Sequence, residues 1–401
     1  MRKTIFTLLL GLLTLTSQAQ QPVEKTIVWD GLDRHYLEYV PTTYTAGDSA
    51  PVMFYLHGMG DHAADAFNAI NPIDFAEAKG WIMVFPQAVD WTYSLPMNLG
   101  NFPMGPSWNA GIHVDAAVSY LGNPYVLSVD VNPDVDDSGF LVKALQTVEQ
   151  EYDIDTDSIF FCGFSLGGFM SHRMAIEHGD VINSIAAVSG NIANTMSTLT
   201  PVANVNVLQI HGTADTVVSY DSASVSYGQY GPYNVGLGAE ASTEYWRAFN
   251  HCDPQAVVEF YPDTHPDGLT FEMHSFLNGD NNSRVALLKV NNGGHYWYNG
   301  ENNDIDYLTE IYRFFTNTLD VTGTAENGEK GLLTVYPNPA ADFIVLPLEE
   351  PAEVRIFDLT GSEVLHEHTH GRIDVSQLPN GFYFLNTATV HKYRARFVIS
   401  H

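Results

Sequence analysis

Basic residues are scarce in this chain of 401 residues, which has 17 Lys and Arg against 47 Asp and Glu. The formal net charge of −30 argues against nucleic acid or an anionic membrane as a partner, because an acidic surface offers neither of them countercharge. Cysteine is scarcer still, with Cys162 and Cys252 alone. The two could pair in an exported protein, but Cys162 lies in an apolar segment typical of a buried thiol. The sequence leaves both states open.

Long apolar runs are also lacking, apart from one at the N-terminus. Arg2 and Lys3 precede the apolar residues 5–15, and Ser17-Gln18-Ala19 follows them. A positive end, a short apolar stretch and small residues at the cleavage position are typical of a secretory signal peptide. We therefore predict a signal peptide over residues 1–19. We predict no transmembrane segment, because no later stretch is long and apolar enough to span a bilayer.

Between residues 20 and 318 the chain alternates short apolar segments with segments of helical character. Buried strands are predicted at residues 52–56, 81–85, 158–162, 185–188, 205–210 and 285–289, and helices at residues 139–151, 168–177 and 304–318. Alternating strands and helices favour an α/β fold, with a mostly parallel sheet that is covered by helices on both faces.

The end of the chain has a different character. Residues 319–330 are polar, carry two glycines and lack apolar periodicity, which is typical of a linker. Short strand-like segments follow between residues 331 and 401, separated by turn residues such as Pro379-Asn380-Gly381. We expect residues 331–401 to form a small C-terminal β-sandwich.

The segment Gly163-Phe164-Ser165-Leu166-Gly167 fits the pattern G-x-S-x-G. Alone the pattern is weak, because three fixed positions recur by chance in roughly one chain in ten of this size. Its context strengthens it, because it follows an apolar strand and opens a helix, which is the arrangement of a nucleophile elbow. We therefore predict Ser165 as a nucleophile. The alternative is an ordinary serine in a glycine-rich turn.

A serine hydroxyl needs a neighbouring base at neutral pH. Two later strands run into the letters HGTAD and NNGGH, so Asp215 and His295 follow Ser165 in the order that α/β-hydrolases use. We predict that His295 accepts the Ser165 proton and that Asp215 orients His295. Taken singly, Asp215 could cap a turn and His295 could be a surface residue. His57 and His211 lie near the same edge, and we interpret them as hydrogen-bonding residues that stabilise loops.

Two backbone N–H groups are candidates for an oxyanion hole. The N–H of Leu166 lies at the predicted helix N-terminus after the serine, where it can bind an oxyanion. The segment HGMG after the first predicted strand supplies the N–H of Met59 as the second donor, with a plain glycine turn as the alternative. No metal or other cofactor is predicted. The Asn- and Asp-rich residues 278–282 and 299–306 could hold Ca²⁺, but they lack an ordered ligand spacing, which favours turns and helix caps.

The chain resembles the family of secreted polyhydroxybutyrate depolymerases, feruloyl esterases and acetyl xylan esterases, carbohydrate esterase family one and its relatives. The similar segments lie over residues 27–318 in the family's order: YLHGMGD, PSWNAG, DDSGFL, FFCGFSLGGFMSHRMA, LQIHGTADTVVSY, YWRAFNHC and GGHYW. The resemblance implies an α/β-hydrolase fold, a serine esterase that acts through an acyl-enzyme, and the same triad and oxyanion residues. The chain departs from the family at Met59, where cysteine is frequent, and after Trp297, where the family often has Pro-Gly.

The last part of the chain resembles the C-terminal sorting domain of the type IX secretion system of Bacteroidetes. The similar segments are VYPNPAADFIVL, VRIFDLTGSEVL, IDVSQLPNGFYFL and the closing RFVIS, within residues 331–401. The resemblance implies the type IX secretion machinery as a partner, export across the outer membrane, and a protein that is extracellular or attached to the cell surface. A spacer or binding domain of similar strand content is the alternative.

The sequence leaves the substrate open among feruloyl, acetyl and hydroxybutyrate esters of plant polysaccharide or polyester. Trp108, by its family position, and Trp297, two residues past His295, are the preferred candidates for stacking on an aromatic acyl group or a sugar ring. The alternative is that these rings pack long loops together. A peptidase or thioesterase of the same fold, and a non-catalytic surface binding protein, are the alternative functions.

Overall fold

The computed structural model describes residues 21–94, 100–120, 123–222, 224–227, 230–318, 335–346, 351–357, 363–388 and 394–401. The predicted signal peptide and the predicted linker lie outside the described residues. The chain divides into two compact units, Met1–Thr318 and Leu319–His401, which are described separately. The domain bounds that the sequence predicts, residues 20–318 for the hydrolase domain and 331–401 for the sorting domain, stay a prediction.

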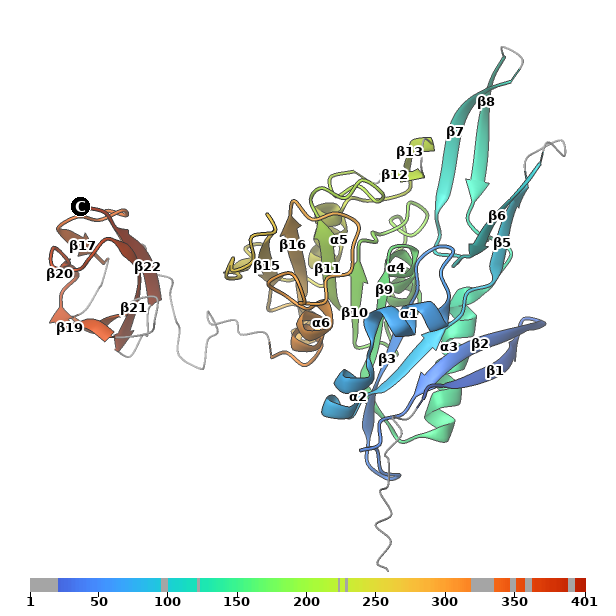
Figure 1. Cartoon of the computed structure of the whole chain (residues 1–401), viewed down its shortest axis with the longest axis horizontal. Coiled ribbons are helices and arrows are strands. Elements are labelled where there is room, and N and C mark those ends of the chain that lie inside the picture. The colour runs from blue at the N-terminus through green and yellow to red at the C-terminus, as the bar shows by residue number, and fades with distance from the viewer. Residues whose placement is uncertain are drawn as a thin grey trace, which may run out of the picture. The chain divides into compact units, whose positions relative to one another are not determined.

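A ten-stranded sheet forms the centre of the first unit, in the order β1-β2-β4-β3-β9-β10-β11-β16-β15-β14 (Figure 1). The six middle strands are parallel: β4 (Ile82–Pro86), β3 (Ala50–Leu56), β9 (Ile154–Phe164), β10 (Ser184–Val188), β11 (Asn206–Gly212) and β16 (Val285–Asn291). Two antiparallel strands extend each edge: β1 (Val23–Trp29) with β2 (Leu32–Tyr39), and β15 (Thr270–Phe276) with β14 (Val257–Phe260). The predicted mostly parallel sheet is confirmed.

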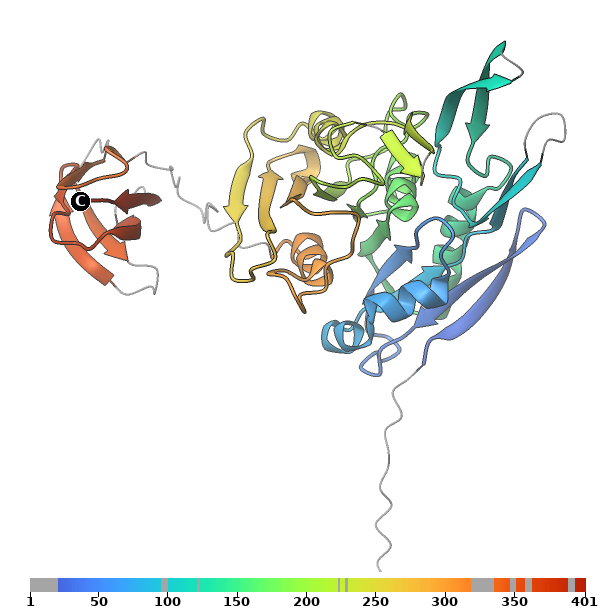
Figure 2. The same ribbon diagram turned by 45° about the horizontal axis from the view of Figure 1, so that its top comes forward.

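Helices cover both faces of this sheet. One face carries α3 (Asp137–Glu151), α4 (Leu166–His178) and α5 (Ala239–Phe249), and the other carries α1 (Ala63–Ile70), α2 (Ile73–Lys79) and α6 (Tyr307–Phe315) (Figure 2). Two adjacent residues of β9 show the division, because consecutive strand side chains point to opposite faces. The ring of Phe160 stacks on Phe315 of α6, whereas Phe161 belongs to the core under α3 and α4.

Three β-hairpins rise where the parallel strands end. The hairpins β5–β6 (Asp90–Ser94, Asn101–Pro106) and β7–β8 (His113–Tyr120, Asn123–Asp130) lie between β4 and α3, and β12–β13 (Ser224–Tyr227, Tyr230–Asn234) lies between β11 and α5. Figure 1 shows the first two extending away from the sheet, and β13 packs against β7. They stand at the edge that holds the carboxyl ends of the parallel strands, where ligands bind in open α/β sheets.

The predicted elements agree with the observed ones in type but not in extent. The strand predicted at residues 158–162 runs over Ile154–Phe164. The helix predicted at residues 304–318 begins later, at Tyr307, because the Asp306 carboxylate accepts a hydrogen bond from Thr309 N–H at 2.7 Å and caps it. Both cysteines are buried free thiols, so the two are not bridged. No helix in the described part of the chain is long and apolar enough to cross a bilayer.

The second unit is built from antiparallel strands. Four of them form the sheet β19-β18-β21-β22, with ranges Glu363–Thr369, Ala352–Phe357, Gly381–Ala388 and Arg394–Ile399. A second sheet pairs β17 (Phe343–Val345) with β20 (Arg372–Asp374). Alternate side chains of both sheets bury an apolar core, which includes Ile344, Val354, Ile356, Ile373, Leu385 and Phe397. The predicted small β-sandwich is confirmed.

Candidate active site

Ser165 lies in a sharp turn between β9 and α4. Its φ of 55° falls in a region that residues with a side chain rarely adopt, so the backbone there is strained. Glycines on both sides permit the turn: a Cβ at Gly163 would overlap the Gly167 carbonyl, and a Cβ at Gly167 would overlap the Leu56 carbonyl. The turn is held by hydrogen bonds from Ser165 N–H to Val188 O and from Gly168 N–H to Ser165 O, both at 2.8 Å. These are the features of a nucleophile elbow.

Asp215 and His295 lie together on neighbouring loops. Asp215 follows β11 and His295 follows β16, and these two strands pair in the sheet. The loops are joined by hydrogen bonds from Ala214 N–H to Gly293 O and from Thr213 N–H to Val290 O, both at 2.9 Å. His295 Nδ1 lies 2.7 Å from Asp215 Oδ2. The structure therefore brings together the predicted acid and base, which are 80 residues apart in sequence.

The surroundings of Asp215 keep its carboxylate ionised. Burial alone would raise the pKa of Asp215, but hydrogen bonds from His211 and His295 outweigh burial and hold that pKa well below its usual range. The other oxygen, Oδ1, accepts from the backbone N–H groups of Val217 at 2.8 Å and Val218 at 2.9 Å. A fixed negative charge next to Nδ1 orients the imidazole of His295, so that Nε2 is left as the basic nitrogen.

The imidazole of His295 lies beside the elbow. Its ring centroid is 4.8 Å from that of Phe164, the residue before Ser165. Within the described part of the chain no hydrogen bond joins Ser165 Oγ to His295. In enzymes without bound substrate this bond is frequently long or poorly aligned. The elbow, the predicted base and the predicted acid thus lie at one edge of the sheet.

The loop after β3 lies against the elbow from the other side. A Cβ built on Gly58 would stand 3.5 Å from Ser165 Cβ, which places the backbone of residues 58 and 59 next to Ser165. Within the described residues, the N–H groups of Met59 and Leu166 donate to no protein acceptor. Two unpaired N–H groups beside the predicted nucleophile have the arrangement that can bind a developing oxyanion.

His57 supports this loop and is not available as a base. Its ring is fully buried, with Nδ1 2.7 Å from Gly58 O and Nε2 3.1 Å from the N–H of Ala88. Nε2 accepts from Ala88, so Nδ1 carries the proton and donates to Gly58. Burial lowers the pKa of His57 to about 4, so the ring is neutral. The interpretation of His57 as a loop-stabilising residue agrees with these contacts.

Trp108 lies behind the same loop. Its ring is fully buried, and its Nε1–H donates to His57 O at 2.9 Å. The next residue, Asn109, donates its N–H to Asp137 at 2.7 Å, and Asp137 pairs with the buried Arg34 at 2.6 Å. The ring therefore offers no exposed face for the stacking that the sequence predicted. Its contacts are those of a residue that holds the loop in place.

Trp297 is partly exposed and packs edge-on against two tyrosines. Its ring centroid is 5.4 Å from that of Tyr55 and 5.6 Å from that of Tyr307. Tyr296, directly after His295, is 66% exposed and was missed by sequence reasoning. An exposed aromatic ring next to the base is a further candidate for substrate contact. Its only sequence signal was its position beside the histidine.

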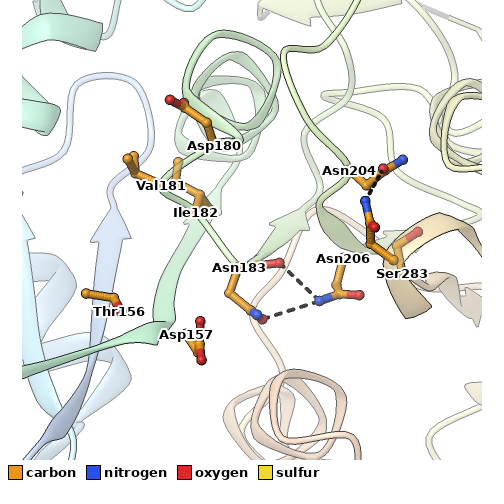
Figure 3. A pocket seen from close by; sticks show the side chains of 10 residues that line it. Thr156, Asp157, Asp180, Val181, Ile182, Asn183, Asn204, Asn206 and Ser283 are labelled. Carbon is orange, nitrogen blue, oxygen red and sulfur yellow. Dashed lines mark hydrogen bonds between the residues drawn. The ribbon is translucent and has the colours of Figure 1, made fainter.

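A polar cavity of about 220 Å³ lies elsewhere in this unit (Figure 3). Asn183, Asn206 and Ser283 line it, and they precede or begin the strands β10, β11 and β16. The cavity is therefore at the amino ends of the parallel strands, at the edge opposite to Ser165. No group of three or more His, Cys, Asp or Glu side chains that could hold a metal ion occurs among the described residues.

Two family models match this chain. Residues 42–231 match the model described as phospholipase/carboxylesterase, and residues 334–400 match the secretion system C-terminal sorting domain. The first match lies within the unit Met1–Thr318, and the second lies within the unit Leu319–His401.

Among curated proteins, the chain is similar to a putative esterase, NocK, of Nocardia uniformis subsp. tsuyamanensis. The identity is 25% over 69% of this chain and 74% of that protein. It is 34% identical to feruloyl esterase D of Neurospora crassa, over 56% of this chain and 62% of that protein. Among solved structures, an acetyl xylan esterase from Aspergillus awamori is 14% identical, with a TM-score of 0.46 over 73% of this chain and 99% of that chain.

The family matches agree with the features found from the residues upward. The first model covers the loop after β3, the elbow at Ser165 and the turn at Asp215. Residues 42–231 thus resemble the phospholipase/carboxylesterase family, and residues 334–400 resemble the secretion system sorting domains. Together with the esterase relatives and the fold, these matches make this chain a secreted carboxylic ester hydrolase of the α/β-hydrolase fold.

Proposed function

We propose that the chain hydrolyses carboxylic esters through an acyl-enzyme on Ser165, with His295 as the base and Asp215 as the acid that orients it. The observation that carries this proposal is the 2.7 Å contact of His295 Nδ1 with the buried Asp215, on loops beside a strained serine elbow. A buried carboxylate with a depressed pKa next to an imidazole is the electrostatic arrangement that serine hydrolases use.

The proposed reaction proceeds in two halves. His295 Nε2 takes the Ser165 proton while Oγ attacks the ester carbonyl, and the carbonyl oxygen becomes an oxyanion that the N–H groups of Met59 and Leu166 bind. The intermediate collapses as the imidazolium protonates the leaving alcohol, which leaves an acyl-serine. Water, deprotonated by His295, attacks the acyl carbon, and a second collapse returns the proton to Ser165 and releases the acid.

For the substrate, we propose feruloyl or acetyl esters of plant polysaccharide. The relatives include a feruloyl esterase, and Tyr296 and Trp297 present aromatic surface directly after the base. Such rings suit an aromatic acyl group or the face of a sugar. In this proposal Trp297 contacts substrate, whereas Trp108 acts through the loop that it supports. A polyhydroxybutyrate-type polyester is the competing substrate.

We further propose the type IX secretion machinery as the partner of the C-terminal unit. The match of residues 334–400 to a sorting domain supports this role. The product of export is then an esterase that is extracellular or attached to the cell surface, where polymeric esters are accessible.

The test is an assay of the purified chain on p-nitrophenyl acetate, methyl ferulate, acetylated xylan and a hydroxybutyrate oligomer. We expect turnover of the acetyl and feruloyl esters, and a loss of about 10⁶-fold in kcat for Ser165→Ala. Ser158→Ala is the matched control, because Ser158 lies in the strand that leads to Ser165, seven residues before it, and its hydroxyl donates to Asp155 at 2.7 Å. Equal and negligible turnover by the wild type and Ser165→Ala would refute the proposed esterase activity. A preference for the hydroxybutyrate oligomer would refute the proposed feruloyl or acetyl substrate.

A further inference from the structure

Besides its contact with His295, Asp215 is approached from the protein interior by a row of hydrogen-bonded side chains. It runs from Trp246 in α5 through His172 in α4 to Gln209 and His211 in β11. All four side chains are fully buried. A buried polar group without a partner is costly, so the donors and acceptors of such a chain must be matched along its whole length.

The chemistry of Trp246 sets the direction of this chain. An indole N–H can only donate, and Trp246 Nε1 lies 3.1 Å from His172 Nδ1. His172 Nδ1 must therefore accept. Burial lowers the pKa of His172 to about 4, so the ring is neutral and its one proton lies on Nε2. That proton is donated to Gln209 Oε1, which is 2.9 Å away.

The orientation of the Gln209 amide determines which ring nitrogen of His211 accepts a hydrogen bond. With its oxygen facing His172, the amide nitrogen faces Gly190 O at 2.8 Å, His211 Nδ1 at 3.3 Å and Asn191 Oδ1 at 3.4 Å. His211 Nδ1 is thereby the acceptor, so the proton of its ring lies on Nε2. That nitrogen is 2.9 Å from Val218 O and 3.5 Å from Asp215 Oδ2.

We infer that Gln209 and His211 are positioning residues for Asp215, because the amide keeps the His211 proton on the nitrogen that faces the acid turn. Val218 completes the clamp, since its carbonyl accepts from His211 and its N–H donates to Asp215 Oδ1 at 2.9 Å. The other tautomer would set an imidazole lone pair against the carbonyl and the carboxylate, and repel Asp215. The inference rests on the proposed role of Asp215 in catalysis.

The same chain ties the acid to the nucleophile. His172 lies in α4, the helix that begins directly after Ser165, while Gln209 and His211 lie in the strand that leads to Asp215. Gln209 therefore fixes the helix of the elbow and the turn of the acid to one another. A displacement of either one is resisted by buried hydrogen bonds.

The first test replaces His211 in the full-length chain. His211→Leu removes the donor, and we expect kcat for p-nitrophenyl acetate to fall roughly ten- to hundredfold with KM nearly unchanged, as for loss of a hydrogen bond to a charged group. His211→Gln carries an amide N–H to about the same place, and should recover most of the loss. Tyr39→Phe is the control, because it removes the part-buried hydrogen bond that the hydroxyl of the buried Tyr39 donates to Glu77, in a strand near the other end of the sheet.

The second test measures the tautomers by nitrogen-15 NMR of the histidine rings. We expect the Nε2–H form for both His172 and His211 in the wild type, and a mixture at His211 in Trp246→Phe or Gln209→Leu. A His211 ring protonated on Nδ1 overturns the inference, as does wild-type kcat in His211→Leu while Asp215→Asn is inactive. Full activity in Asp215→Asn would instead overturn the proposed function.

Discussion

The two units of this chain bury different kinds of side chain. The first unit, Met1–Thr318, is the hydrolase unit, and it buries histidines and carboxylates completely, among them His57, His172, His211 and Asp137. In the described part of the C-terminal unit the buried polar side chains are Thr369 and Thr387, and the rest of the core is apolar. Burying an ionisable group costs stability unless it is paired. The difference teaches that the hydrolase unit holds its loops and its candidate site with buried, paired polar groups, whereas the C-terminal unit is held together by apolar packing.

The largest test of this contrast removes the charge of the buried acid. Asp215→Asn should lower kcat for an acyl ester by about 10⁴, because His295 loses the group that holds its tautomer and stabilises its imidazolium. The thermal transition of the C-terminal unit should not change. Steady-state kinetics and scanning calorimetry on the same preparation measure both. A variant that retains a tenth or more of wild-type kcat would show that the acid is misassigned.

The next largest effect is expected from pH, which should change the stability of the hydrolase unit more than that of the C-terminal unit. The pKa values of His57 and His172 are lowered to about 4 in the folded state, against about 6.5 in an unfolded chain. Between these values the unfolded state binds more protons than the folded state. The contribution of the two neutral histidines to the free energy of unfolding is therefore fully present above pH 6.5, and it is lost as the pH falls toward 4. The loss is about 3 kcal/mol for each histidine.

Urea unfolding at several pH values between 7 and 4 measures this effect. The C-terminal unit has no buried histidine among its described residues, so its transition should move less over the same range. Parallel shifts of the two transitions would contradict the contrast between the units.

The smallest effect is expected when one methyl group is removed from each core. Ile356 in β18 and Ile185 in β10 are both fully buried. Ile356→Val should lower the stability of the C-terminal unit by about 1 kcal/mol and leave kcat unchanged. Ile185→Val should lower the stability of the hydrolase unit by a similar amount. If each substitution moved both transitions in calorimetry, the two units would unfold as one.

The central fold could be predicted because its signals are local. The strand at residues 158–162 is a continuous apolar run, and a parallel strand with helices on both faces requires such a run. The outer strands escaped prediction for the opposite reason: β14 is short, and alternate residues such as Val258 and Phe260 face solvent. The three hairpins were missed because their aromatic- and proline-rich segments carry no clear period.

The site was predictable only as far as motifs reach. Chain order and strand ends indicated Asp215 and His295, and the structure places them in contact. Gln209 and His172 carried no motif, because their importance depends on which side chains of α4 meet those of β11 on the face of the sheet that α4 covers. Trp108 was predicted at a substrate surface from its position in a motif. Burial is set by the whole fold, and the motif gave no sign of it.

The strained backbone at Ser165 has a consequence for engineering. A glycine would adopt a φ of 55° without cost, so residue 165 is a place where a substitution toward higher thermal tolerance is easy to find. A library selected for heat resistance alone would favour substitutions at this position and would lose the proposed nucleophile. Selection for a robust enzyme from this chain therefore has to score turnover in every round.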